Sequence, residues 1–341
     1  MVEIGQAQIR QAHAEFLETL FRELENAGVR YCVLQRWDAL MGEVATDHDI
    51  DISAPPGEVE KLRRAMGALW QRGYRPIQLL NHAVNSYAII FGWMDGAELK
   101  TVMVDVTFEH RQCGLIWRSA EQLLAGRQKP GAFWVASPET ELAYLLVKKV
   151  LKDNWSAARS GRFRVLAKRM GKARAEQVAA EIFGEKAKRD IVQACLAGRP
   201  ERAVRPLRRR FLVRSMARNP LHVLRYAVEN GIRLAGRWMR PTGAMLETPD
   251  ADLGRQLGAA LGPAFGKVTV SWAGRSWLRY WLRIRPLMAR NGLVIVDGSQ
   301  PAPPFTPEPE LRVASTVEPV GEVLKDLLER LSVRFGRQHS D

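Results

Sequence analysis

Cysteine is scarce in this sequence, and the cysteines stand far apart. The 341 residues contain only Cys32, Cys113 and Cys195. Disulfide frameworks and zinc knuckles need closely spaced cysteines, so the sequence indicates neither. We interpret all three as buried or incidental thiols.

Long hydrophobic runs are absent as well. The longest apolar stretches, such as residues 87–93 and 293–296, are far shorter than the roughly 20 residues that a membrane-spanning helix requires. Residues 1–10 carry Glu3 and no apolar core, so they do not have the pattern of a secretory signal. We therefore expect a cytoplasmic protein, and the length of the chain favours two domains as a starting expectation.

Basic residues are in short supply in the first part of the chain and abundant in the rest. Residues 1–140 contain 14 Lys and Arg against 18 Asp and Glu, a net charge of −4. Residues 141–341 contain 37 against 19, a net charge of +18. This excess favours a polyanionic neighbour, and nucleic acid, an anionic membrane and a phosphorylated substrate all remain open.

The hydrophobic pattern of residues 1–140 predicts a mixed α/β domain. Apolar positions recur at helical spacing in residues 5–27 and 58–71, and four shorter runs have the composition of strands. The order is helix, strand, strand, helix, strand, strand. The predicted strands are residues 29–35, 50–53, 88–91 and 99–108.

The rest of the chain predicts a helical region followed by a second α/β unit. Residues 139–197 favour long helices, beginning with one over residues 139–155. Residues 201–240 contain eleven Arg, no Lys and two acids in an amphipathic helical pattern. Strand signals resume at residues 244–246, 267–272 and 293–297, and a final helix is predicted at residues 320–335. The predicted α/β protein thus has a first domain at residues 1–140, a helical region at 141–240 and a second domain at 241–341.

A pair of aspartates opens the second predicted strand. Asp49 and Asp51 are two residues apart, so on a strand both carboxylates project from the same face. Two converging carboxylates repel each other unless a divalent cation lies between them, and Mg²⁺ takes carboxylate and phosphate oxygens as ligands. Asp105 is the only acid in the β-prone residues 102–106, which makes it the candidate third ligand of a two-metal site. A turn of solvated acids is the alternative interpretation of residues 47–51.

These motifs resemble those of the nucleotidyltransferase superfamily. Residues 31–40 read YCVLQRWDAL, residues 49–52 read DIDI and residues 104–106 read VDV. The chain is similar in particular to bacterial members in which this domain precedes a thymidylate-kinase-like domain. The resemblance implies that Asp49, Asp51 and Asp105 are the catalytic acids, that they hold Mg²⁺, and that the substrate is an NTP.

One feature of the superfamily is missing. Many members carry a Gly-Ser turn before the acid pair to cradle the triphosphate, whereas here the chain reads LQRW at residues 34–37. Arg36 is a candidate replacement for that phosphate contact. Lys148 and Lys152 lie four residues apart on one helical face, and the family commonly uses a basic residue of this helix to bind the nucleotide. A solvated surface is the alternative for all three side chains.

The second domain resembles a P-loop kinase that has lost its site. A P-loop needs a glycine-rich turn between a strand and a helix, followed by Lys and Ser or Thr. At the corresponding place the glycines fall on Ala251 and Leu253, the lysine on Gly254 and the hydroxyl residue on Arg255. The resemblance therefore implies a degenerate, pseudokinase-like domain at residues 241–341, with an unrelated small α/β domain as the alternative.

Two classes of function follow from these observations. The first is Mg²⁺-dependent transfer of a nucleotidyl or other phosphoryl group to an unknown acceptor hydroxyl or phosphate, for which the resemblance implies a setting in surface glycan assembly. The second is a non-catalytic scaffold or regulator built from degenerate nucleotide-binding folds. The acid triad favours the enzyme, whereas the missing Gly-Ser turn and P-loop favour the scaffold.

The Arg-rich segment suggests further partners. Arg side chains supply sequence-independent contacts to nucleic-acid phosphates, but no nucleic-acid-binding fold accompanies them here. The apolar residues interleaved in residues 202–240 also fit a helix lying on an anionic membrane, which would make the protein membrane-peripheral. A solvated helix between domains is the third interpretation.

Overall fold

The computed structural model describes most of the chain as two compact units. The first unit is Met1–Thr46, Asp51–Ala65 and Val106–Val228, and the second is Asp47–Ile50, Met66–Asp105 and Glu229–Asp341. Each unit combines segments that are far apart in the sequence, so the division at residues 140 and 240 stays a prediction. The described residues are 2–35, 50–112, 115–150, 155–200, 206, 209, 213, 216–217, 219–239, 241–248, 250–265, 267–271, 284–297, 311–313 and 319–338.

The first unit begins with helix α1 (Val2–Asn26). From Phe16 onward its apolar residues recur at helical spacing and are buried. Gly28, with a φ of 66°, follows the helix in the left-handed conformation that glycine tolerates. Strands β1 (Cys32–Val33) and β2 (Ile50–Ser53) then pair antiparallel. At the end of β2 the Ala54 N–H and the Ser53 hydroxyl donate to the carbonyl of Thr107, the last residue of β5 (Glu98–Thr107).

The sheet that contains β2 has the strand order β1-β2-β5-β4-β3. Strands β3 (Arg75–Ala83) and β4 (Ser86–Asp95) form an antiparallel pair in the second unit. The sequence pattern located β4 and β5 but predicted no strand at β3, and this was wrong. The reason is that Pro76, Gln78 and Asn81 interrupt the alternation by which a strand is recognised.

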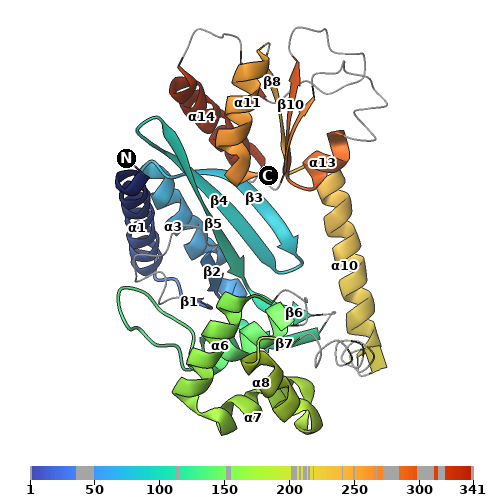
Figure 1. The fold of residues 1–341 in the computed structure, drawn as a ribbon. Helices are drawn as coiled ribbons and strands as arrows, with labels where there is room; N and C mark the ends of the chain where they lie inside the picture. The colour runs from blue at the N-terminus through green and yellow to red at the C-terminus, as the bar shows by residue number, and fades with distance from the viewer. Residues whose placement is uncertain are drawn as a thin grey trace. The chain divides into compact units, whose positions relative to one another are not determined.

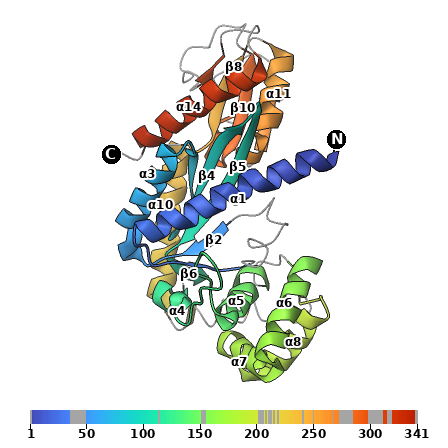
Figure 2. The ribbon, with the colours of Figure 1, turned by 90° about the vertical axis from the view of Figure 1, so that its left-hand side faces the viewer.

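The remainder of the first unit consists of the two-stranded sheet of β6 and β7 followed mainly by helices. Several of these helices pack around one hydrophobic core (Figure 2). The predicted helical region is confirmed for the described residues, with one difference. The helix predicted at 139–155 is α-helical only at the start and continues as a π-helix, η2 (Leu145–Val150), because apolar spacing over six residues does not distinguish a π-turn from an α-turn. The elements are β6 (Glu109–Gln112), β7 (Leu115–Ser119), α4 (Ala120–Leu124), α5 (Pro138–Tyr144), α6 (Ala157–Met170), α7 (Lys172–Phe183), η3 (Glu185–Ala187) and α8 (Lys188–Leu196).

A parallel sheet forms the core of the second unit. Its strand order is β11-β8-β10-β9, and all three neighbouring pairs are parallel. Residues 293–296 of β10 are all buried, as expected of a parallel strand covered on both faces. The elements are β8 (Ala244–Thr248), α11 (Ala251–Leu261), η4 (Gly262–Ala264), β9 (Lys267–Ser271), α13 (Arg285–Ala289), β10 (Gly292–Asp297), β11 (Leu311–Arg312) and α14 (Val320–Gln338).

The two sheets contribute to one hydrophobic core within the second unit. Buried residues of β3 and β4 pack with those of β8, α11, β10 and α14, and α14 lies along β3 (Figure 1). Gly92 of β4 allows this close packing, since a Cβ there would lie 3.1 Å from Leu328 Cδ1. The predicted α/β fold class is confirmed by the mixed and parallel sheets and the helices around them.

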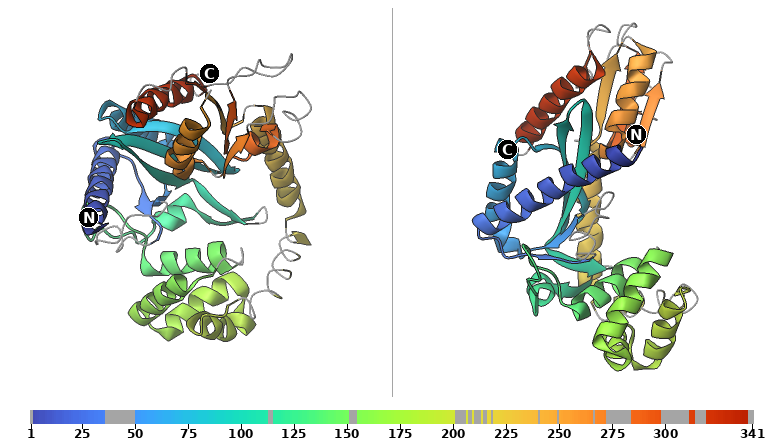
Figure 3. Two further views of the ribbon diagram at one scale, coloured as in Figure 1. Left: turned by 45° about the horizontal axis from the view of Figure 1, so that its top comes forward. Right: turned by 60° about the vertical axis from the view of Figure 1, so that its left-hand side comes forward.

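Four of the described elements pass from one unit to the other, namely β2, α3 (Val59–Gln71), β5 and α10 (Pro220–Met239). The short helix η1 (Pro56–Glu58) precedes α3 in the first unit. Helix α10 is one uninterrupted helix (Figure 3) and confirms the helical prediction for this part of the Arg-rich segment. Within the described ranges no helix combines the length and the apolar character needed to cross a membrane.

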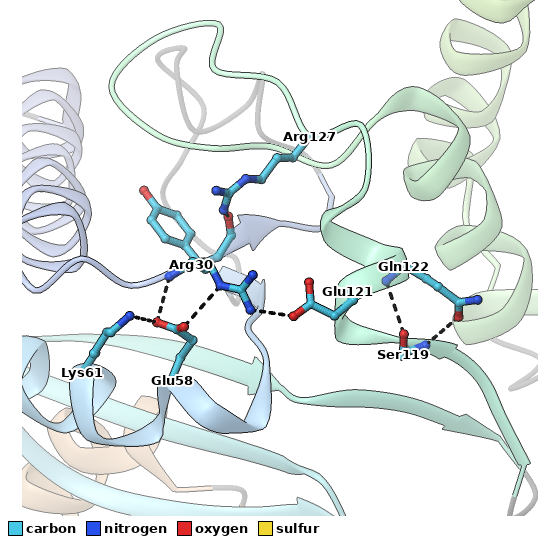
Figure 4. A network of polar contacts seen from close by, with 8 residues as sticks. Arg30, Glu58, Lys61, Ser119, Glu121, Gln122 and Arg127 are labelled. Atoms are coloured by element: carbon cyan, nitrogen blue, oxygen red, sulfur yellow. Dashed lines mark hydrogen bonds and ion pairs between the residues drawn. The ribbon is translucent and has the colours of Figure 1, made fainter.

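An ionic network around Glu58 joins three segments of the first unit (Figure 4). The buried Glu58 carboxylate accepts from the Arg30 N–H at 3.1 Å and from Arg30 Nε at 3.3 Å, and it lies 2.9 Å from Lys61 Nζ. Arg30 also contacts Glu121 at 2.5 Å. Burial by itself would raise the pKa of Glu58, but the hydrogen bonds from Lys61 and Arg30 outweigh it and lower the pKa below its ordinary value.

We expect Glu58→Gln to reduce the free energy of unfolding by about 1–2 kcal/mol at pH 7, a range that allows for the partial exposure of Arg30. Because the folded-state pKa is depressed, this contribution is present above the unfolded value of about 4.3 and is lost as the pH falls through the folded value. Urea unfolding at pH 7 and at acidic pH should therefore show wild type and variant converging in acid. Glu60→Gln, at an exposed acid two residues away, is the control and should have little effect. A stability difference for Glu58→Gln that is independent of pH would contradict the role of the carboxylate.

Candidate functional site

Asp51 is the acid of a strand that is buried along its whole length. All four residues of β2 are buried, and Asp51 is only 5% exposed. Its Oδ1 accepts from Lys148 Nζ at 2.7 Å, and its Oδ2 accepts from the side-chain amide of Gln35. The backbone carbonyl of Asp51 binds the Leu34 N–H, so the strand pairing itself fixes where this side chain starts. A charged carboxylate with this little exposure requires such partners.

Lys148 reaches Asp51 from the helix that follows the sheet. That helix starts at Pro138, with the Ser137 hydroxyl accepting from the Thr140 N–H as an N-cap. Lys148 lies in η2, where its ammonium group also donates to the Tyr144 hydroxyl and lies 4.9 Å from the centre of the Tyr144 ring. The edge of the His110 ring packs against the buried Tyr144, with 4.8 Å between ring centres.

A second ion pair fixes the position of this helix. Both Glu141 carboxylate oxygens accept from the Arg162 guanidinium at 2.6 Å, and Glu141 is fully buried. The paired geometry joins α5 to α6 with two parallel charge-assisted hydrogen bonds. Lys148 is therefore presented from a helix that is anchored one turn before Leu145.

Of the six predicted site residues, the structure brings Asp51 and Lys148 together. Asp105 lies on β5, and its Oδ1 accepts from the Ser86 hydroxyl at 2.6 Å. Asp49, Arg36 and Lys152 lie outside the described residues. The metal-binding role of the acids and the phosphate-binding role of the basic residues stay predictions.

Sequence reasoning missed three side chains of this cluster: Gln35, which contacts Asp51, Tyr144, which contacts Lys148, and His110, which packs against Tyr144. Tyr144 stands four residues before Lys148, a helical spacing that would have suggested their contact. Gln35 follows a strand, and His110 lies at the start of a strand that was not predicted, so neither carried a signal of its own. Within the described ranges no group of three or more His, Cys, Asp or Glu side chains is placed to hold a metal ion, and Asp49 falls outside those ranges.

The buried cysteines are not part of this chemistry. Cys32 is fully buried, its thiol donates to the Leu123 carbonyl at 3.6 Å, and burial raises its pKa to about 12. Such a thiol stays protonated at neutral pH and is not an activated nucleophile. Cys195 is buried among apolar residues of the helical core.

The first backbone N–H groups of α11 are hydrogen-bonded to a carboxylate of the chain itself. Asp250 is the N-cap of α11, and its Oδ1 accepts from the N–H groups of Asp252 at 2.7 Å and Leu253 at 3.2 Å. These are helix N-terminal amides of the kind that a P-loop presents to phosphate. Arg255, which the resemblance aligns with the P-loop hydroxyl residue, forms an ion pair with Asp252. Both groups that could attract a phosphate here thus have acidic partners within the chain.

Comparisons with known proteins give a limited likeness. No family model and no curated protein matches the chain. Among solved structures, the Helicobacter pylori protein JHP933 is similar with a TM-score of 0.33 at 10% identity, over 62% of this chain and 97% of that one. A second H. pylori protein, described as a candidate nucleotidyltransferase, is similar with a TM-score of 0.29 at 10% identity, over 59% of this chain and 95% of that one. The likeness is low in sequence and in superposition, so the function proposed below depends on the residues of this chain.

We expect Lys148→Met to reduce the free energy of unfolding by about 2–3 kcal/mol, because it leaves Asp51 charged and buried without its cation. Chemical denaturation at neutral pH measures this loss. The double variant Asp51→Asn/Lys148→Met should lose less than the two single variants added together, since it leaves no buried charge. Lys168→Met, at an exposed position on α6, is the matched control. Equal stability of the Lys148 and Lys168 variants would rule out the ion pair as a structural contact.

The turn between β8 and α11 leads to a further expectation, that the protein lacks P-loop kinase activity. Residues 248–255, where the resemblance places the P-loop, contain no lysine that could neutralise a transferring phosphoryl group. The full chain, incubated with Mg-ATP and each common nucleoside monophosphate, should form no nucleoside diphosphate above the level without protein. Steady, enzyme-dependent formation of a diphosphate would show that a working kinase site lies elsewhere in the chain.

Proposed function

We propose that this protein catalyses Mg²⁺-dependent transfer of a nucleotidyl group from an NTP to an acceptor hydroxyl or phosphate. The observation that carries the proposal is the buried carboxylate of Asp51 held by Lys148, which comes from the helix after the sheet. An acid on the strand and a base on the following helix are the two kinds of side chain that the sequence motifs of this reaction require.

The three carboxylates of the acid motifs are of the kind that suits a hard cation. Carboxylate oxygens are the ligands that Mg²⁺ prefers, and Asp49 and Asp51 are spaced to project from one face of the strand. We propose Asp105 as the third carboxylate. Its strand, β5, is the neighbour of β2 in the sheet order, and the hydrogen bonds to Thr107 that support this pairing lie just beyond Asp105. Bound Mg²⁺ would supply charge neutralisation of the phosphates and a lower pKa of the acceptor hydroxyl.

Lys148 is the residue that we propose for contact with the nucleotide phosphates. The Lys148 side chain is one-fifth exposed and its ammonium group donates to the Tyr144 hydroxyl, so it combines a fixed position with partial exposure to solvent. A phosphate that approaches Asp51 would lie within reach of the same ammonium group, and that proximity orients the reacting phosphorus. Arg36 and Lys152 are proposed as further phosphate contacts from their positions in the sequence.

A non-catalytic scaffold is the second candidate, and one observation favours it. In the second unit, the helix N-terminal amides that could bind a phosphate donate to Asp250, and Arg255 forms an ion pair with Asp252. This observation concerns the second unit alone and does not affect the acids of the first. We therefore propose an enzyme in which residues 241–341 serve in packing or partner binding, acting in surface glycan assembly as the resemblance implies.

The test is nucleotide binding by the full chain. Wild-type protein, titrated calorimetrically with each of the four common NTPs in Mg²⁺, should bind at least one with micromolar affinity. Asp51→Asn should weaken that binding at least tenfold, a loss of about 1.4 kcal/mol, because it removes a carboxylate ligand. Asp49→Asn should abolish binding of Mg²⁺ itself without unfolding the protein.

The controls separate the site from general effects of charge. Asp95→Asn changes an exposed acid at the end of β4 and should bind the NTP as wild type does. Circular dichroism of every variant checks that the fold is intact. If none of the four NTPs binds, or if Asp51→Asn binds as tightly as Asp95→Asn, the nucleotidyl transfer proposal fails and the scaffold is favoured.

A further inference from the structure

Helix α10 and the residues just before it carry most of the large apolar side chains that are exposed. In the described ranges twelve large hydrophobic side chains are exposed, and nine of them lie between residues 213 and 239. No residue of α10 is buried. Seven of its large apolar side chains are 42–78% exposed, namely those of Leu221, Leu224, Val228, Ile232, Leu234, Trp238 and Met239.

These side chains form a stripe along the helix. At 3.6 residues per turn, Leu221, Leu224, Val228, Ile232 and Met239 project within an arc of about 80°. A stripe of this kind normally packs against the body of its own protein. In α10 it is exposed, so it is a surface that something else must cover.

The side of α10 away from the stripe carries polar side chains, and one of them contacts the second unit. Arg233 donates to the Asn81 carbonyl of β3 at 2.7 Å and to the Asn230 side chain. Burial, and to a smaller extent the positive charge of Arg233, lower the pKa of Arg237 one turn later. Arg233 thus contacts β3, whereas the large apolar side chains of the stripe are exposed.

The charge around the stripe indicates the chemistry of what covers it. Residues 201–240 contain eleven Arg against two acids, and Arg225 and Arg209 are exposed. We propose that α10 lies in the plane of an anionic membrane surface, with the stripe inserted among the acyl chains and exposed arginines such as Arg225 near the lipid phosphates. Apolar burial and attraction to anionic headgroups are the two contributions that bind such helices. This inference is independent of the proposed nucleotidyl transfer.

The same observations argue against other occupants. A second copy of the chain would bring two Arg-rich segments together, and their repulsion would oppose a dimer formed through the stripe. Nucleic acid would satisfy the arginines but would leave the leucine, isoleucine and methionine side chains exposed to water. Only an anionic, apolar partner matches both features, and a bilayer has that chemistry over the whole length of the helix.

Co-sedimentation of the full chain with lipid vesicles tests the proposal. Wild-type protein should bind vesicles of phosphatidylcholine with phosphatidylglycerol at low salt. Its binding to vesicles of phosphatidylcholine alone should be at least fivefold weaker. The double variant Leu224→Glu/Ile232→Glu should reduce binding to the anionic vesicles about tenfold, because it places charges in the apolar stripe. Raising the salt to 0.5 M should weaken binding by wild type.

The matched control is Val165→Glu, which makes the same kind of change at an exposed apolar residue of α6 that is 55% exposed. It should bind the vesicles as wild type does. Sedimentation equilibrium without lipid provides a second readout, in which wild type should remain monomeric. A dimer that the Leu224→Glu/Ile232→Glu variant abolishes would assign the stripe to a second copy. That outcome would overturn the membrane proposal. The proposal would also fail if wild type did not bind vesicles, or if the Leu224→Glu/Ile232→Glu variant bound them as well as the Val165→Glu variant.

Discussion

The ion pair between Asp51 and Lys148 is the contact on which the candidate site depends. A carboxylate at 5% exposure would lose much of its hydration, and Lys148 at 2.7 Å replaces it. The pair also connects a strand near the start of the chain with a helix almost a hundred residues later. Since neither charge is well solvated, the helix and the strand must keep this arrangement for either to stay charged. The geometry of the site and the stability of the first unit therefore have the same cause.

The helix that carries Lys148 is built to hold it in place. Glu141 and Arg162 fix α5 against α6, and from Leu145 onward the chain widens into a π-helix. A π-turn shifts the following side chains around the helix axis relative to an α-helix, and such turns often occur at functional sites. Here the shift accompanies a lysine that contacts both Asp51 and the Tyr144 hydroxyl. The irregular turn is thus where the helix meets the strand.

The sequence predicted those parts of the structure that depend on local patterns. The helices α1 and α14, the strands β2 and β10, and the placing of Asp51 on a strand all follow from spacing and strand propensity. Strand β3 was missed because Pro76 and the polar residues of the strand interrupt the alternation of apolar and polar side chains. The strand is buried by α14, which is more than two hundred residues away in the sequence. Lys148 was named as a site residue, whereas Gln35 and His110 were not, since their roles arise only when distant segments meet.

The two units treat negative charge in opposite ways, and this contrast bears on which of them is active. In the first, a buried acid is balanced by a lysine whose side chain is one-fifth exposed, so the cation keeps contact with solvent. In the second, Asp250 has taken the amides at the start of α11, and an incoming phosphate would have to compete with a carboxylate attached to the same chain. An intramolecular partner has a high effective concentration, so a free phosphate competes poorly with it. If the protein binds a nucleotide, the physical chemistry of these two sites favours the first.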